Sequence, residues 1–110
     1  MGDQALILIE DESEVIREKP YRGLKIVTED DDFFVLRLNV RTVRTSPGKV
    51  VYSVDIEGPD NSIYTLGYSR SQDVAERKMK KSEEQLDAGY GLRIIDSSGK
   101  AKLVKVKRRE

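Results

Sequence analysis

The chain has 110 residues, 36% of them charged, and its 20 basic and 20 acidic side chains give a formal net charge of zero. It contains no cysteine and no histidine, which excludes disulfides, thiolate metal sites and histidine-based catalysis. The length predicts one domain over residues 1–110, ending in a basic tail at 107–110.

Composition also bears on where the protein works. No apolar run approaches the ~20 residues needed to cross a bilayer, and the first residues lack a signal-peptide pattern, so we expect a cytoplasmic protein. The chain is rich in charge and holds only five Asn and Gln residues, which is typical of thermophiles and fits an archaeon. Residues 1–32 hold ten acids and four bases, whereas 67–110 hold twelve bases and seven acids. This asymmetry favours a macromolecular partner, although a heat-adapted surface explains it equally well.

The N-terminal third is predicted to contain two short strands, at 5–9 and 24–27, because both segments are apolar. The acidic segment at 10–14 and the turn-like Pro20–Gly23 separate them. Residues 29–32 are predicted to be an acidic loop that leads into a longer strand.

A β-hairpin is predicted from Phe33 to Glu57, because apolar residues recur at every second position on both sides of Ser46-Pro47-Gly48. A three-residue loop at this point keeps apolar residues opposite apolar ones. It pairs Thr45 with Lys49, and further along it pairs Thr42 with Tyr52, Val40 with Val54, Leu38 with Ile56, Asn39 with Asp55 and Arg37 with Glu57. The predicted core face of the first strand holds Phe34, Leu36, Leu38 and Val40.

After a turn at 58–61, a strand is predicted at 62–68, with a bulge or close approach at Gly67. An amphipathic helix follows, with Ser71 as its N-cap and Gly89 as its C-terminal stop. Its apolar stripe consists of Val74, Ala75, Met79, Ser82 and Leu86. A closing hairpin of 92–96 and 101–107 completes the chain.

This order predicts a mainly β fold: an OB-like small barrel with a β-β-β-α-β-β core, an additional N-terminal strand and one amphipathic helix. An open sheet with one helix packed on it, or another small barrel, remains an alternative.

We expect no catalytic, cofactor-binding or metal-binding residues. Pro59-Asp60 followed by Glu76-Arg77-Lys78 loosely matches a metal-dependent nuclease pattern, but the two acids fall in a turn and on an exposed helix face. The acidic run at 29–32 lacks the spacing and the glycine of an EF-hand. The chain is therefore predicted not to be an enzyme by itself.

Direct nucleic-acid binding is a weaker hypothesis. OB-folds bind single strands across the second and third strands and the adjoining loops. The candidate contacts for a partner or for nucleic acid are Lys49, Tyr64, Tyr68, Tyr90, Lys100, Lys102, Lys105 and Lys107. Against this hypothesis, the hairpin register places Glu57 opposite Arg37 and Asp55 beside Arg41, which cancels charge where phosphates would run.

Several segments resemble the eighth subunit of RNA polymerase, a family shared by archaeal and eukaryotic polymerases. These are ILIEDE (7–12), YRGLKIVTEDDDFFVLRLNV (21–40), VVYSVDI (50–56), the Tyr90-Gly91-Leu92 sequence and the basic VKVKRR (104–109). Two features depart from the family pattern: Arg93 replaces an apolar residue, and 71–88 is helical where the family has loop and strand.

The resemblance implies an OB-derived barrel that serves as a non-catalytic subunit of an archaeal DNA-directed RNA polymerase. Its expected role is to dock on the large and alpha-like subunits and support assembly, with any contact to nucleic acid indirect. The alternatives are a stand-alone OB-type binder of single-stranded nucleic acid and a small regulatory or viral protein that binds a basic enzyme surface.

Overall fold

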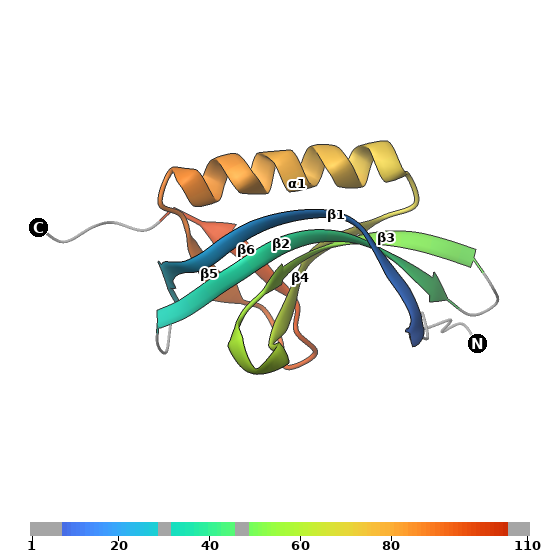
Figure 1. The fold of residues 1–110 in the computed structure, drawn as a ribbon, viewed down its shortest axis with the longest axis horizontal. Helices are drawn as coiled ribbons and strands as arrows, with labels where there is room; N and C mark the ends of the chain where they lie inside the picture. Colours follow the sequence, from blue (N-terminus) through green and yellow to red (C-terminus); the bar gives the residue numbers. More distant parts are fainter. Residues whose placement is uncertain (1–7, 29–31, 46–48, 106–110) are drawn as a thin grey trace, which may run out of the picture.

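The computed structural model of the protein describes residues 8–28, 32–45 and 49–105 (Figure 1). The first part of the predicted strand at 5–9, the acidic loop at 29–31, the turn at 46–48, Lys107 and the basic tail lie outside the described residues.

The described residues form two antiparallel sheets and one long helix (Figure 1). The larger sheet contains, in spatial order, β1 (Leu8–Val27), β2 (Asp32–Thr45), β3 (Lys49–Glu57) and β4 (Ile63–Ser69). The smaller sheet contains β5 (Gly91–Ile94) and β6 (Ala101–Val104). Helix α1 (Gln72–Asp87) comes between the two sheets in the chain, and the 3-10 turn η1 (Pro59–Asn61) joins β3 to β4 at the predicted turn.

The hairpin register predicted from the alternation is confirmed. Strands β2 and β3 pair Thr45 with Lys49, and the ladder continues without a shift to Leu38 with Ile56 and Arg37 with Glu57. Apolar side chains on both strands therefore reach the same side of the sheet, because side chains alternate with a period of two.

The prediction of two separate N-terminal strands is wrong, because β1 is one strand of 20 residues. Its ladder with β2 has three register shifts, and Gly23, with a φ of 83°, lies within the last of them, between Pro20 and Leu24. Bulges absorb extra residues while the backbone continues to pair. Acidic and turn-forming side chains therefore interrupt the sequence pattern without ending the strand.

The predicted core face of β2 is correct only in its second half. Leu38 and Val40 are fully buried, but Phe34 is 46% exposed and Val35 is fully buried in its place. The strand thus changes the face that it turns to the core between Val35 and Leu38. This change coincides with the last irregularity of β1 and with the point beyond which β2 no longer pairs with β3.

Helix α1 lies along one face of the larger sheet (Figure 1). The Ser71 side chain accepts a hydrogen bond from the Val74 backbone N–H at 3.4 Å, and Gly89 has a φ of 87° just beyond the helix, which confirms the predicted cap and stop. The buried stripe consists of Ala75, Met79, Ser82 and Leu86. Val74 was placed in this stripe wrongly: it is 45% exposed, since it lies about 100° around the helix from Ala75.

One apolar core joins α1, the larger sheet and the β5–β6 hairpin, and it includes Leu38, Ile56, Met79, Leu86, Leu92 and Ala101. The two sheets meet at a parallel bridge between Thr65 and Lys100, where the Thr65 N–H donates to the Gly99 carbonyl at 2.7 Å. No helix among the described residues is long and apolar enough to cross a membrane.

Candidate functional site

The side of the β2–β3 hairpin that faces away from the core carries a row of polar residues. We call this row the polar face; it consists of Arg37, Asn39 and Arg41 on β2 and of Ser53, Asp55 and Glu57 on β3. The sequence pattern predicted a face of paired charge and did not predict its burial. The middle of the row is closed to solvent: Asn39 is fully buried, and Ser53 and Asp55 are each 2% exposed.

At one end of the polar face, Arg37 lies between two carboxylates. Its Nη1 donates to Glu57 Oε1 at 3.1 Å, and its Nε is 3.4 Å from Glu18 Oε2 on β1. The Asn39 amide also donates to Glu57. Arg37 therefore has a carboxylate on each side. The register predicted the contact with Glu57, whereas the contact with Glu18 was not predicted.

In the middle of the polar face, Asp55 accepts hydrogen bonds from Ser53 Oγ at 3.1 Å and from Thr65 Oγ1 at 3.0 Å. Arg41 Nε is 3.3 Å from Asp55 Oδ2, but it makes no aligned hydrogen bond, so the contact is electrostatic. Burial raises the pKa of Asp55 above its ordinary value, and the Arg41 charge and the two hydroxyl donors offset only part of this effect. The carboxylate is thus held inside the structure, out of reach of a substrate in solvent.

The raised pKa of Asp55 makes a signed prediction about stability. A carboxyl with a higher pKa in the folded state binds its proton more tightly there, so folding is favoured as the pH falls through that pKa. Relative to Asp55→Asn, the native chain is expected to gain unfolding free energy as the pH is lowered from 7 towards the ordinary aspartate value near 4. Urea denaturation at stepped pH measures this difference, and Asp60→Asn in the exposed turn η1 is the control. A native chain that loses stability relative to Asp55→Asn would mean that the Arg41 pair outweighs burial.

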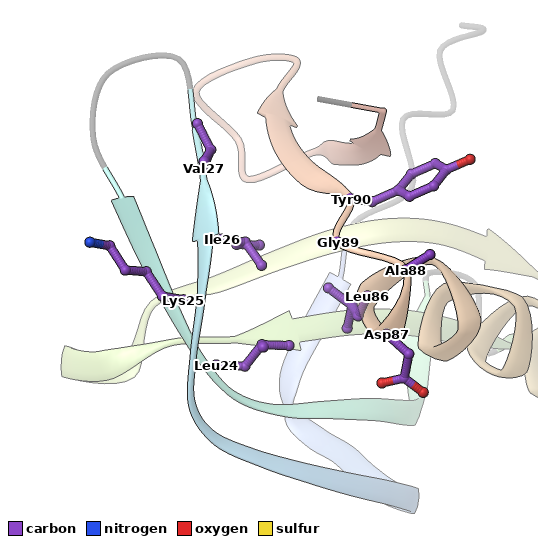
Figure 2. Close-up of a pocket in the computed structure, with 9 residues that line it drawn as sticks. All are labelled: Leu24, Lys25, Ile26, Val27, Leu86, Asp87, Ala88, Gly89 and Tyr90. Atoms are coloured by element: carbon purple, nitrogen blue, oxygen red, sulfur yellow. The ribbon is translucent and has the colours of Figure 1, made fainter. Parts of the chain in front are cut away.

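A second candidate site lies where the last part of β1 faces the connection from α1 to β5. An opening of about 520 Å³ is lined there by residues 24–27 of β1 and 86–90 of the connection (Figure 2). We call this opening the seam. Figure 2 shows Leu24 and Ile26 pointing from β1 towards Leu86, while Lys25 points away from the opening.

The strand that lines the seam, β1, and the strand that begins directly after it, β5, are both at sheet edges. Among the described strands, β1 pairs only with β2, and β5 pairs only with β6. Figure 2 shows that β1 and β5 run in the same direction on either side of the opening. An edge strand presents backbone N–H and C=O groups that a further strand can bind.

Acidic groups gather near one end of the seam. Burial raises the pKa of the Tyr21 hydroxyl, with Asp87 and Glu83 of α1 adding to the effect, and among the described residues this buried hydroxyl has no hydrogen-bond partner. Lys19 Nζ is 3.7 Å from Glu83 and 5.9 Å from the centre of the Tyr21 ring.

The contact residues predicted from sequence lie in different parts of the structure and do not form one surface. Tyr90 lines the seam, and Lys100, Lys102 and Lys105 are exposed on or beside β6. Tyr64 is half-buried with its ring edge-on to Phe33 at 5.2 Å, so it belongs to the wall of the core. Tyr68 is 41% exposed and pairs with Ser53 on the polar face, and Lys49 opens β3 at the far end of the hairpin. Lys107 lies outside the described residues.

Sequence reasoning did not identify the seam, apart from Tyr90. Residues 24–27 were assigned to a strand without a known neighbour, and residues 86–89 were treated as the end of a helix. No local sequence pattern in either segment predicts that the two lie close together, because their proximity depends on how α1 crosses the sheet. Among the described residues, no group of three or more potential ligands is placed to hold a metal ion. No family model, curated protein or solved structure matches this chain.

Proposed function

We propose that this chain is a non-catalytic β module that binds another protein, built as an OB-like barrel that is open along the seam. The OB-like interpretation is supported by the element order β2-β3-β4-α1-β5-β6, with β1 as the additional strand. It is also supported by the parallel bridge from β4 to β6, because this contact joins the strands on either side of the helix.

The seam is the observation that carries the proposal. It lies at the edge of β1 and just before the start of β5, and its lining includes the apolar Leu24, Ile26 and Leu86. Val27 in its lining is 51% exposed, and Ile94 on β5 is 38% exposed. Free strand edges and adjoining apolar side chains are features that proteins cover or use for binding. A partner covering this region would bury roughly 800 Å² on each side, as in an ordinary protein–protein interface.

The partner assembly we propose is an archaeal DNA-directed RNA polymerase, with contacts to its large and alpha-like subunits. This part of the proposal rests on the resemblance of the β1, β2 and β3 segments and of Tyr90-Gly91-Leu92 to the eighth polymerase subunit. The polar face accords with a protein partner, because Arg37 and Arg41 already lie against carboxylates instead of forming a cationic track for phosphates.

The experiment is affinity purification of the tagged chain from an extract of its native cells, with the bound proteins identified by mass spectrometry. We expect the large and alpha-like polymerase subunits in amounts comparable to the tagged chain. Val27→Gln, in the seam, is expected to reduce their recovery several-fold. The matched control Val74→Gln, at a similarly exposed valine on α1, should leave recovery unchanged.

Two results would contradict the proposal. Recovery of other proteins without polymerase subunits would reject the polymerase assignment. Tight binding of single-stranded oligonucleotides, with an affinity that falls steeply with salt and no protein partner, would favour a nucleic-acid binder instead.

A further inference from the structure

We infer that the seam binds an arginine side chain of the partner, with the aliphatic stem of the arginine along the apolar wall and its guanidinium at the carboxyl end of helix α1. The inference rests on the proposed protein-binding function and deepens it, because it names the chemistry by which the seam recognises a partner. It combines the apolar lining of the seam with the negative potential of the helix end.

One wall of the seam is apolar. Leu24 and Ile26 point from β1 towards Leu86 at the end of α1 (Figure 2), and Ile26 and Leu86 belong to the core. The opening of about 520 Å³ falls within the roughly 300–1,000 Å³ that is usual for ligand pockets. Arginine and lysine have long aliphatic stems that pack on apolar surface while the charged group stays in polar surroundings. This wall therefore suits a long basic side chain whose charged group meets negative potential at one end.

The carboxyl end of α1 provides this negative potential. A helix carries the equivalent of roughly half a negative charge at its C-terminus, because its last carbonyl groups lack donors within the helix. Here the backbone N–H groups of residues 88–90 donate to the carbonyls of residues 84–86. Among the described residues, no backbone N–H donates to the carbonyls of Asp87 and Ala88, and both residues line the seam. A basic side chain can bind carbonyl groups at such a helix end.

Asp87 adds a full negative charge at the same place. Figure 2 shows Asp87 near the end of the seam that Leu24 marks, whereas Tyr90 lies nearer the other end. Cations stabilise a helix C-terminus, yet α1 has no basic residue in its last turn. Glu83 has Lys19 as its partner at 3.7 Å, but Asp87 forms no ion pair within the described part of the chain. The fold thus places a carboxylate where a helix favours a cation, and a basic guest supplies that cation.

The lysines next to the seam do not occupy it. Lys25 lines the seam but points away from the opening (Figure 2). Lys19 lies against Glu83 and is 5.9 Å from the centre of the Tyr21 ring. The opening beside Asp87 is therefore left for a cation from another chain.

Arginine suits this end of the seam better than lysine. Its planar guanidinium has five N–H donors, so it can bind a carboxylate and carbonyl groups together, and it is less strongly hydrated than an ammonium group. Burial, and then Asp87 and Glu83, raise the pKa of the Tyr21 hydroxyl, so both carboxylates lie close enough to act on it. This hydroxyl has no hydrogen-bond partner among the described residues, and its oxygen is one further acceptor.

The test is an NMR titration of the ¹⁵N-labelled full chain with a seven-residue peptide that has arginine between two leucines and Gly-Ser at both blocked ends. It is run at about 0.15 M salt, where the Debye length of about 8 Å screens distant charges. We expect saturable shifts at residues 24–27 and 86–90. The peptide with citrulline, which keeps the shape of arginine without its charge, should bind at least tenfold more weakly. The lysine peptide should bind several-fold more weakly.

Substitution of Asp87 separates the contact from general attraction. Asp87→Asn is expected to weaken the arginine peptide at least fivefold and to leave the citrulline peptide unchanged. Glu84→Gln is the matched control, because it removes the same charge from the last turn of α1 but outside the lining of the seam, and it should change affinity less than twofold. Asp87→Asn should not lower the urea midpoint, since an acid at a helix C-terminus is unfavourable. Loss of binding then reports the contact and not unfolding.

Four outcomes would overturn the inference. The first two are equal binding of the arginine and citrulline peptides and the absence of shifts at the seam. The third is an equal loss of affinity in Asp87→Asn and Glu84→Gln, which would mean that charge attracts the peptide without a specific contact. The fourth is tighter peptide binding when Arg108→Gln and Arg109→Gln are combined, which would make the chain's own basic end the occupant.

These outcomes are independent of the purification experiment. Polymerase recovery without arginine-dependent binding at the seam leaves the proposed function in place and rejects the arginine contact. Arginine-dependent binding at the seam without polymerase recovery supports the contact and rejects the polymerase as the partner.

Discussion

Leu38→Ala is expected to lower the free energy of unfolding by about 2–5 kcal/mol, the range found when a buried leucine is truncated. Leu38 is fully buried and lies opposite Ile56, which is also fully buried, at the centre of the sheet beneath α1. The cavity would therefore form where three elements meet and cannot collapse easily. Because a domain of this size has only about 5–15 kcal/mol of stability, the loss should shift the urea midpoint measured by circular dichroism substantially.

Phe34→Ala is the matched comparison, since it removes more atoms from the same strand. Phe34 is 46% exposed, so its loss should cost less than about 1 kcal/mol. Both variants should keep the m-value of the native chain, because the same surface is exposed on unfolding. A larger cost at Phe34 than at Leu38 would mean that β2 does not change its core-facing side and that simple alternation holds along the whole strand.

Strand β2 contains one feature that its sequence predicts, the hairpin register, and one that it does not, the change of face. The hairpin register could be derived because Val40, Val54, Leu38 and Ile56 fit only one pairing, and the pairing is local in the chain. The change of face between Val35 and Leu38 could not, because it coincides with a register shift in the neighbouring strand β1 that no local pattern in β2 indicates. The residues of β1 at this register shift are polar and turn-forming, so their sequence does not show the alternating pattern by which a strand is predicted.

The two candidate sites also differ in how much of each could be predicted from the sequence. The contacts of Arg37 with Glu57 and of Arg41 with Asp55 follow from the register and were predicted. The burial of Asp55 was not, because exposure depends on Thr65 in β4 and on the packing of long side chains over the strand. The seam depends entirely on tertiary structure, since it joins residues about 60 positions apart.

Gly58→Ala is expected to cost about 1–3 kcal/mol, although the backbone at this position suits any residue. Gly58 has φ −118° and ψ −170°, an extended conformation, so the cost does not come from backbone strain. A Cβ atom there would overlap the tip of the Phe33 ring and lie 2.5 Å from its Cε1 atom. The ring cannot yield freely, because it packs against the core and stands edge-on to Tyr64 at 5.2 Å.

Gly67→Ala is the control, because it makes the same substitution in the neighbouring strand. A Cβ atom at Gly67 would meet only Lys78 Cε at 3.5 Å, an ordinary contact with a flexible side chain. Neither glycine has a positive φ. The difference between the two variants therefore measures the clash with Phe33, and Gly67→Ala should change the unfolding free energy by less than about 0.5 kcal/mol.

A double-mutant cycle assigns the clash to the ring. Phe33→Ala removes the obstructing atoms, so Gly58→Ala in that background should cost close to nothing, and the coupling energy should approach the full ~1–3 kcal/mol. If the cost persists without the ring, its cause lies in η1, where Gly58 N–H donates to the Ser62 carbonyl at 2.8 Å. The close contact between Gly58 and Phe33 fixes η1 against β2. The cycle therefore tests whether the absence of a side chain at Gly58 determines how closely the connection between β3 and β4 approaches the core.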